Sequence, residues 1–241
     1  NALAVPGQPF ISCRLRTRQV EGFQRYSFGI NELLGRTSKR DLSILVTTFG
    51  SRANLITLID SIEKAVTEAD LDNVKIYVAN DDPDHPLEGR IISKLPLFVS
   101  DNPLNFGYTN NVNQAIGKLD RNSLVLLLND DLAISPHSIR RALEAMSLTS
   151  AAIVGFKLLF KDGSLQESGG IVWSDGNPWN IGRGYSTTSY ENVLREVDYC
   201  SAAAVLLDLS RMPLLPGEKM FDSAFSPAYF EDTDLCIRVK E

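Results

Sequence analysis

Short apolar runs that alternate with amphipathic segments organise most of the chain. Residues 42–48 and 74–79 are aliphatic and β-branched, which is typical of strands that are buried on both faces. Between them, residues 53–66 repeat apolar side chains at the spacing of one helix face. A strand, a helix and a strand in this order predict a parallel βαβ unit. Further strands are expected at residues 97–100 and 124–128, with a helix between them.

The pattern changes in the second half of the chain. Ser135 is a good helix N-cap and Pro136 suits the first helical position, ahead of an apolar stripe. The segment 169–190 is rich in Gly, Asn, Ser and Trp, which predicts a long functional loop. The remaining expectations are one or two strands in residues 151–160, a hairpin turn at 161–164 and a strand at 202–207.

The first 40 residues differ from the rest. They are basic and show poor periodicity, so we expect residues 1–40 to be an N-terminal extension or the tail of a preceding domain. Residues 41–241 are expected to form the main domain. The chain starts without an initiator Met and ends within a helix-like pattern, which predicts that this domain is truncated at its C-terminus.

Composition narrows the function classes. With a net charge of −6, the chain lacks the basic surface that nucleic-acid binding needs, so no nucleic-acid partner is expected. An anionic small-molecule substrate stays compatible, because a bound divalent cation reverses the local field. Three cysteines, Cys13, Cys200 and Cys236, show neither zinc spacing nor a disulfide framework, which favours a reducing compartment. The sequence holds no run of about 18 apolar residues, so no transmembrane helix is expected.

Carboxylates follow the strand predicted at residues 124–128 directly. Asn129, Asp130 and Asp131 stand at the strand end, the edge of an open α/β sheet where ligands bind. Oxygen ligands of this kind suit Mg²⁺ or Mn²⁺, which one or two carboxylates often hold together with substrate phosphates. A polar turn ahead of the next helix is the alternative.

A second polar cluster, Asn80-Asp81-Asp82, follows the strand predicted at residues 74–79. It should lie at the same edge of the sheet, because the carboxyl ends of parallel strands meet there. Its carboxylates could accept hydrogen bonds from a nucleobase or a ribose. A turn through Asp82 and Pro83 explains the cluster equally well.

A third cluster, Glu231-Asp232, lies beside Tyr229 and Phe230. A carboxylate in a partly apolar setting is a candidate general base, because burial raises its pKa. Alternatively, Asp232 or Thr233 simply caps the helix that follows.

Other candidates carry less weight. Trp173 and Trp179 could stack on a sugar or a base, or anchor the 169–190 segment to the surface. His85 and His137 fit solvated positions in a turn and in the first turn of a helix. Neither a dinucleotide-binding glycine motif nor a P-loop is present in the sequence.

Taken in order, these segments resemble the nucleotide-sugar-dependent glycosyltransferases of family 2, from about Ser43 to the end of the chain. The rhamnosyl- and galactofuranosyltransferase-like branch looks the most similar. The resemblance implies an α/β fold of the GT-A class, with a Rossmann-like, mostly parallel central sheet flanked by helices and a smaller antiparallel element on the acceptor side. It rests on motifs at residues 43–52, 80–81, 105–113, 129–131, 163–170, 198–203 and 221–238.

The resemblance also implies roles for single residues. Asp131 would be the first choice of metal ligand, with Asn129 at the first position of the DxD motif. Asp232 would be the catalytic base, in the motif that includes Glu231. The donor-binding residues would be Thr48, Arg52, Asp81, Asn105, Gly107, Asn113 and Asp130.

The implied activity is an inverting transfer of a sugar, of the hexosyltransferase type. The donor would be a UDP-, dTDP- or GDP-sugar, and the acceptor a hydroxyl group of a glycan or of a lipid-linked molecule. Mn²⁺ or Mg²⁺ would neutralise the charge on the leaving diphosphate. A bacterial, cytoplasmic enzyme of polysaccharide or cell-wall biosynthesis is expected, with membrane association through regions outside this chain as a further option.

Three other readings compete. A non-catalytic nucleotide- or sugar-binding module of GT-A fold would bind without transfer. A sugar-nucleotide pyrophosphorylase would carry a glycine-rich basic loop after the first strand, where this chain has one glycine, Gly50. A phospho-acceptor receiver domain would be much shorter and would have no role for Glu231-Asp232.

Overall fold

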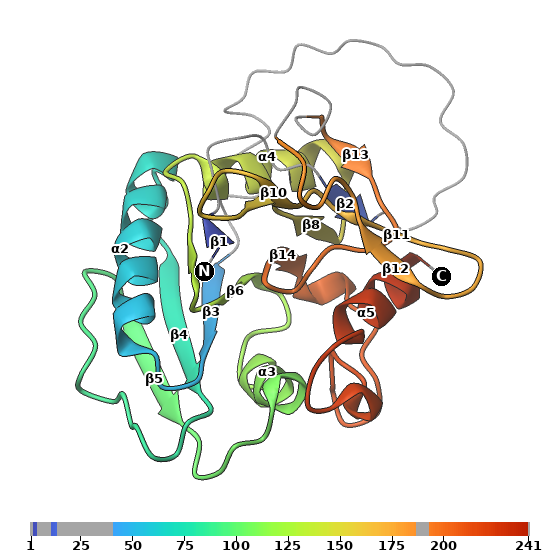
Figure 1. Cartoon of the computed structure of the whole chain (residues 1–241). Coiled ribbons are helices and arrows are strands. Elements are labelled where there is room, and N and C mark those ends of the chain that lie inside the picture. The colour runs from blue at the N-terminus through green and yellow to red at the C-terminus, as the bar shows by residue number, and fades with distance from the viewer. Residues whose placement is uncertain (1, 4–10, 14–40, 187–192, 241) are drawn as a thin grey trace.

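A mixed sheet of eight strands forms the centre of the molecule (Figure 1). The computed structural model describes residues 2–3, 11–13, 41–186 and 193–240. Four neighbouring strands, β6, β3, β4 and β5, run parallel, and β14 pairs antiparallel with β6. In sheet order the strands are β13 (Arg195–Glu196), β2 (Ile11–Cys13), β8 (Ile153–Gly155), β14 (Ala204–Asp208), β6 (Leu124–Asn129), β3 (Leu42–Thr48), β4 (Val74–Asn80) and β5 (Leu97–Asp101).

The four parallel strands confirm the expectation from the apolar runs. Every residue of β3 is buried, and successive side chains point to opposite faces of the sheet. Ile44 and Val46 therefore join one hydrophobic core, and Leu45 joins a second. Strands that are buried on both faces need helices on both faces.

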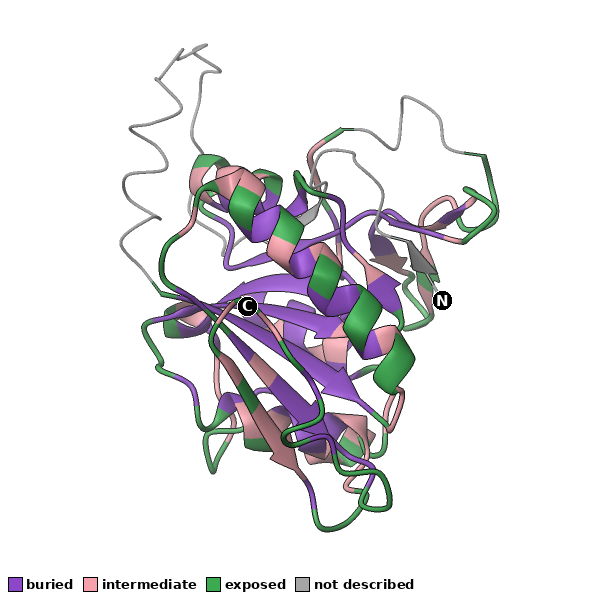
Figure 2. Cartoon of the chain, turned by 90° about the vertical axis from the view of Figure 1, so that its left-hand side faces the viewer, coloured by how far each residue is buried: buried purple, intermediate pink, exposed green. Residues whose placement is uncertain are grey.

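Helices cover the two faces in pairs. Residues of α2 (Arg52–Ala69) and α4 (Ser138–Thr149) belong to the first core, and residues of α3 (Tyr108–Ile116) and α5 (Glu231–Lys240) belong to the second. In Figure 2 the long helix at the front, α2, carries a buried stripe towards the sheet and an exposed stripe outward. This confirms the predicted α/β class with a mostly parallel central sheet.

The start of α4 corrects one expectation. The helix begins at Ser138 with His137 as its N-cap, two residues later than predicted. Ser135 and Pro136 lie in a preceding turn, in which the Ser138 N–H donates to the Ser135 carbonyl at 3.0 Å. The two serine hydroxyls bond each other at 3.0 Å, so the Ser135 side chain is not available as a cap.

Two smaller sheets complete the described part of the chain. One has the order β10-β9-β1-β7, and the other is the hairpin β11-β12, which lies within the segment predicted to be a loop. Gly176, at φ +84°, donates its N–H to the Trp173 carbonyl and closes the hairpin, so this glycine serves a tight turn. The bounds are β1 (Ala2–Leu3), β7 (Leu132–Ala133), β9 (Leu158–Leu159), β10 (Leu165–Glu167), β11 (Gly170–Val172) and β12 (Pro178–Asn180). Two 3₁₀ helices, η2 (Leu209–Arg211) and η3 (Ser223–Phe225), lie between β14 and α5.

Backbone from the N-terminal 40 residues takes part in both larger sheets. β1 pairs with β7 and β9, and β2 pairs with β8 and β13. The two short strands therefore lie within the main fold, whereas residues 4–10 and 14–40 fall outside the described residues. The domain boundary at residue 40 stays a prediction. Among the described residues, no helix has the length and apolar character needed to cross a bilayer.

Candidate active site

Polar residues gather where the parallel strands end, as the sequence predicted. The ends of β3, β4 and β6 and the loop before α3 surround a cleft of about 320 Å³. Seven of the predicted donor and metal residues line this cleft: Thr48, Asp81, Asn105, Gly107, Asn129, Asp130 and Asp131. Phe49, Tyr108 and Asn111 complete its walls together with Thr47.

The acidic triplet is held by the end of β3. The Thr48 hydroxyl donates to the Asp130 carboxylate, and the Asp130 N–H donates to the Thr47 carbonyl at 3.1 Å. The Thr47 hydroxyl donates to the Asn129 side-chain oxygen at 3.3 Å. Burial raises the pKa of Asp130, the Thr48 bond opposes that shift, and the neighbouring charge of Asp131 adds to it. Asp131 itself is exposed at the rim of the cleft.

The donor set fits a metal ion that is shared with a substrate. The described residues hold no group of three or more His, Cys, Asp and Glu that could enclose a metal ion. A strand end with two carboxylates and one amide oxygen instead suits a hard cation whose remaining ligands are phosphate oxygens and water. Asp131 and Asn129 are the predicted metal ligands among these residues.

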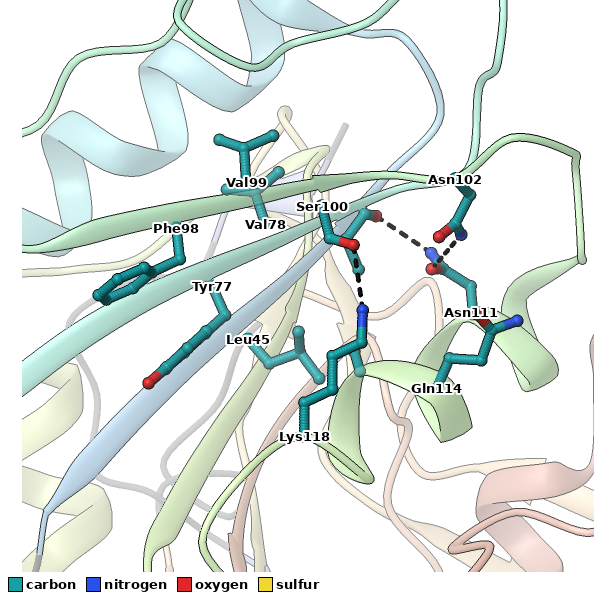
Figure 3. A pocket seen from close by; sticks show the side chains of 12 residues that line it. Leu45, Tyr77, Val78, Phe98, Val99, Ser100, Asn102, Asn111, Gln114 and Lys118 are labelled. Atoms are coloured by element: carbon teal, nitrogen blue, oxygen red, sulfur yellow. Dashed lines mark hydrogen bonds between the residues drawn. The ribbon is translucent and has the colours of Figure 1, made fainter.

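Asp81 is buried and anchors the loop that leads into α3. Its carboxylate accepts from the backbone N–H of Phe106 at 3.0 Å and of Gly107 at 2.8 Å. It also accepts from the Asn102 amide at 2.8 Å. The same amide also donates to the Asn111 side-chain oxygen (Figure 3). The Asn111 amide in turn donates to the Ala79 carbonyl at 3.1 Å. Asp81 therefore fixes one wall of the cleft whether or not it also contacts a ligand.

Gly107 is required at its position by the backbone. Its φ is +76°, and an added Cβ would lie 2.8 Å from the Cβ of Pro227. The Asn105 side chain accepts from the Gly107 N–H at 2.9 Å and so closes the turn before α3. The predicted Asn105-Phe106-Gly107 motif thus shapes the cleft wall through its own hydrogen bonds.

Two predicted donor residues lie elsewhere. Arg52 is exposed in the first turn of α2 and is not among the described residues that line the cleft. Asn113 faces the other way along α3: its oxygen accepts from Met220 N and Phe221 N, and its amide donates to the Phe221 carbonyl at 2.9 Å. This geometry gives Asn113 a structural role, and donor binding by either residue stays a prediction.

Glu231 and Asp232 form the first turn of α5. Asp232 is half-buried and accepts from the backbone N–H of Thr233 at 2.7 Å and of Ala202 at 3.2 Å. Glu231 is 5% exposed, and its Oε2 atom has no hydrogen-bond partner among the described residues. Burial and the neighbouring Asp232 charge raise the pKa of Glu231 to about 7. Burial also raises the pKa of Asp232.

Tyr108 connects this acid pair to the cleft. Its ring lines the cleft, and its hydroxyl donates to the Ala202 carbonyl at 3.1 Å. Burial, followed by the charges of Glu231 and Asp232, raises the pKa of Tyr108 well above its usual range. Tyr108 and Asp232 thus both bond the backbone of Ala202, and neither acid is among the described residues that line the cleft.

Two residues that the sequence reasoning missed stand out. Phe49 is a 58% exposed aromatic residue on the cleft, directly after Thr48. Glu167 is buried and accepts from the Ser201 N–H at 2.8 Å. The N–H of the next residue, Ala202, donates to Asp232. Burial, with a contribution from the Asp232 charge, raises the pKa of Glu167 to about 8. The position of Phe49 could have been predicted, because an aromatic residue directly after a buried strand lies at the ligand-binding edge of the sheet. The burial of Glu167 could not, because it depends on a tertiary contact.

Comparison with known proteins places this geometry in a family. The sequence profile described as Glycosyl transferase family 2 matches residues 43–204, which is more than half of the chain and includes Asp130 and Asp131. The match ends before Glu231 and Asp232. No match was found among curated protein sequences.

Solved structures give a partial overlap. The crystal structure of S. aureus TarS 1-349 is similar over 47% of this chain and 34% of that chain, with 22% identity and a TM-score of 0.39. Its complex with UDP-GlcNAc has the same identity and TM-score and is covered over 33% of its length. The structure of S. aureus TarS itself has a TM-score of 0.38 and is covered over 20%. The chain therefore spans between 20% and 34% of these solved chains.

Proposed function

The chain belongs to glycosyltransferase family 2, and on that premise we propose that it transfers a sugar from a nucleotide-diphosphate sugar to a hydroxyl group of a glycan or a lipid-linked acceptor. The observation that carries the proposal is the cleft at the ends of β3, β4 and β6. Asp130 and, at its rim, Asp131 line it, and so does Tyr108, whose hydroxyl donates to the carbonyl of Ala202, the residue whose N–H donates to Asp232 of the acid pair. One site thus offers places for a diphosphate and, beside it, for a proton acceptor.

The nucleotide end of the donor would occupy the cleft. Thr48 and Asp81 offer hydrogen-bonding groups at the ends of β3 and β4, and the exposed ring of Phe49 offers a flat apolar surface for a base. Asn105 and Gly107 would shape the wall near the diphosphate. UDP, dTDP and GDP are all compatible with these groups, and so is a hexose donor.

A divalent cation would bind with the donor. Asp131, the exposed acid of the triplet, would hold it together with Asn129. When bound, Mn²⁺ or Mg²⁺ would supply positive charge next to the leaving diphosphate. Asp130, which Thr48 already holds, would position the triplet.

Asp232 would act as the base. It would take the proton of the acceptor hydroxyl while that oxygen bonds the anomeric carbon and the bond to the diphosphate breaks on the opposite side, which inverts the configuration. A base must reach the proton it removes. Asp232 is half-buried, whereas Glu231 is almost enclosed, and this difference favours Asp232. Burial also makes the Asp232 carboxylate more basic.

The test compares two substitutions in the full-length protein, using a panel of nucleotide sugars and release of the nucleotide diphosphate. Asp232→Asn should lower turnover by about 10²–10⁴, the usual contribution of a general base. Nucleotide affinity, measured by calorimetry, should stay nearly unchanged because Asp232 does not line the cleft. Glu231→Gln should retain more activity than Asp232→Asn. The reverse order would move the base role to Glu231, and equal loss of turnover and nucleotide binding would contradict both assignments.

The finer assignments follow from motif residues. The proposed similarity to the rhamnosyl- and galactofuranosyltransferase-like branch rests on the segments 163–170 and 198–203. Glu167 of the first segment accepts from the Ser201 N–H of the second, and the Ala202 N–H donates to Asp232. Nucleotide binding by the full-length protein without turnover of any donor would instead favour the alternative, a non-catalytic nucleotide- or sugar-binding module.

A further inference from the structure

A second cavity lies under the β11-β12 hairpin. It measures about 670 Å³ and is formed by residues 171, 178–183, 185 and 199; we refer to it as the hairpin cavity. None of the described residues lines both the hairpin cavity and the donor cleft. The hairpin cavity is therefore a separate space, and the proposed donor chemistry does not account for it.

Its walls combine exposed aromatic rings with polar groups. Trp179 is 66% exposed and Tyr185 is 71% exposed, although large rings are usually buried. Asn180 and Arg183 add an amide and a guanidinium beside them. A sugar ring has apolar C–H faces and a hydroxyl edge, and aromatic rings flanked by hydrogen-bonding groups match both.

Tyr199 places this cavity next to the acids of the proposed active site. It lines the cavity, and its hydroxyl bonds the Asn180 side-chain oxygen at 2.5 Å. Three residues further on, the Ala202 N–H donates to Asp232. The charges of Glu167 and Asp232 contribute, after burial, to a raised pKa of Tyr199.

The ring of Tyr199 is fixed by close packing. It lies against Gly170 of β11, where an added Cβ would be 2.0 Å from the ring carbon Cε1. Only a glycine allows this approach, so packing on β11 and the bond to Asn180 of β12 together fix the Tyr199 ring at the hairpin.

Asp232 thus has one tyrosine towards each cavity. Tyr108 lines the donor cleft and Tyr199 lines the hairpin cavity, and the Asp232 charge adds to the effect of burial in raising the pKa of each. An inverting displacement needs the acceptor hydroxyl on the side of the sugar opposite the leaving group. The hairpin cavity, which the donor would not occupy, offers an acceptor a separate approach on the Tyr199 side of Asp232.

We propose that the hairpin cavity is a saccharide subsite for the acceptor. Trp179 and Tyr185 cover the sugar faces, and Asn180 and Arg183 hydrogen-bond its hydroxyl groups. The proposal rests on the proposed function for its link to transfer, but saccharide binding itself can be measured without turnover.

The two tryptophans of the sequence give a direct test. Trp173 lies on the same hairpin, is 54% exposed and is not among the described residues that line the cavity. In the full-length protein, provided these remain its tryptophans, Trp173→Phe leaves Trp179 as the only reporter. Titration with cellobiose, maltose and chitobiose should then produce a saturable change in tryptophan emission with at least one sugar. Trp179→Phe, which keeps Trp173, should show none.

A second experiment measures the kinetics of transfer to the acceptor that the full-length protein uses. Trp179→Ala should raise the acceptor KM by about tenfold or more, equivalent to about 1.4 kcal/mol. Its kcat and nucleotide affinity should stay close to those of the parent, and Trp173→Ala should behave like the parent in all three. A sugar-dependent signal that persists in Trp179→Phe, or no signal with any sugar in a protein that binds nucleotide, would overturn the proposal. If the parent protein itself does not bind nucleotide, the result would instead count against the proposed function.

Discussion

At the scale of single residues, the acids of the triplet after β6 are not equivalent. The Asp130 carboxylate accepts a hydrogen bond from the Thr48 hydroxyl and is partly buried, so it is less available to bind a metal ion. Asn129 accepts from Thr47 and contributes a neutral oxygen. Asp131 combines a negative charge with exposure at the cleft rim. Its charge and exposure are the reasons for proposing Asp131 as the first ligand of a metal ion that enters with a diphosphate.

Asp131→Ala should therefore remove the part of nucleotide binding that depends on metal. In calorimetry with UDP, dTDP and GDP, the affinity in the presence of Mn²⁺ should fall by at least about tenfold, or about 1.4 kcal/mol. The affinity without Mn²⁺ should change little, because the base and ribose contacts remain.

Asp72→Ala is the matched control for this change of charge. Asp72 is exposed and lies before β4, at the opposite end of that strand from the cleft. It should leave both affinities unchanged. Equal loss of affinity with and without Mn²⁺ in Asp131→Ala would exclude the metal-ligand role.

At the scale of elements, α3 connects the two halves of the site. Tyr108 bonds Ala202, and Thr109 N–H bonds the Pro227 carbonyl at 3.1 Å, in the segment before Glu231. On the next turn, Asn113 holds the backbone of Met220 and Phe221. A helix that the sequence predicts from its apolar positions and its Asn-x-Gly entry thus fixes the chain that leads to the acid pair.

Asn113→Ala should destabilise the fold. The substitution removes three hydrogen bonds to Met220 and Phe221, both of which are fully buried. Unpaired buried backbone groups cost about 1–3 kcal/mol each, so a loss of about 2–4 kcal/mol is expected after relaxation. The urea midpoint should fall while the slope m stays the same.

Gln114→Ala, an exposed neighbour on the same helix, should change stability by less than about 0.5 kcal/mol. If Asn113→Ala instead kept its stability and lost nucleotide affinity, the donor-binding role predicted from the sequence would hold and the structural role would fail.

Elements also show where sequence patterns are informative. The buried strands were predicted because an apolar run of four to seven residues has few other stable environments. The start of α4 was predicted too early, because Ser135 bonds Ser138 within a turn instead of capping the helix. The hairpin β11-β12 was missed, because three-residue strands with polar neighbours lack a clear period.

At the scale of the whole molecule, topology explains which site residues could be predicted. The strand-end clusters meet because parallel strands bring their carboxyl ends to one edge of the sheet, so Thr48, Asp81 and Asp130 converge. Asn113 was predicted to bind the donor from its nearness to Gly107 in the sequence; the structure places its side chain on the backbone of Met220 and Phe221, and donor binding stays a prediction. Glu167 was not predicted at all, because its burial depends on β10 reaching the Ser201-Ala202 turn far along the chain.

Three neighbouring carboxyl groups make the stability of the whole fold depend on pH. Glu167, Glu231 and Asp232 lie around one turn, and all three have raised pKa values. A carboxyl group with a raised pKa is protonated in the native state at a pH where the unfolded chain has already lost that proton. The native state then binds more protons, so the free energy of unfolding falls as the pH rises through this window.

For Glu167 the window runs from its ordinary value of 4.5 to about 8. The parent protein should therefore lose stability between about pH 5 and pH 8, by on the order of a few kcal/mol for so deeply buried a group. Glu167→Gln keeps the acceptor for the Ser201 N–H but cannot ionise, so its free energy of unfolding should fall less over the same range. Urea unfolding at several pH values measures both slopes, with Glu196→Gln, an exposed position on β13, as the control. Parallel slopes in the parent and Glu167→Gln would show that the buried carboxyl does not titrate there, because the removal of a titrating group must flatten the profile.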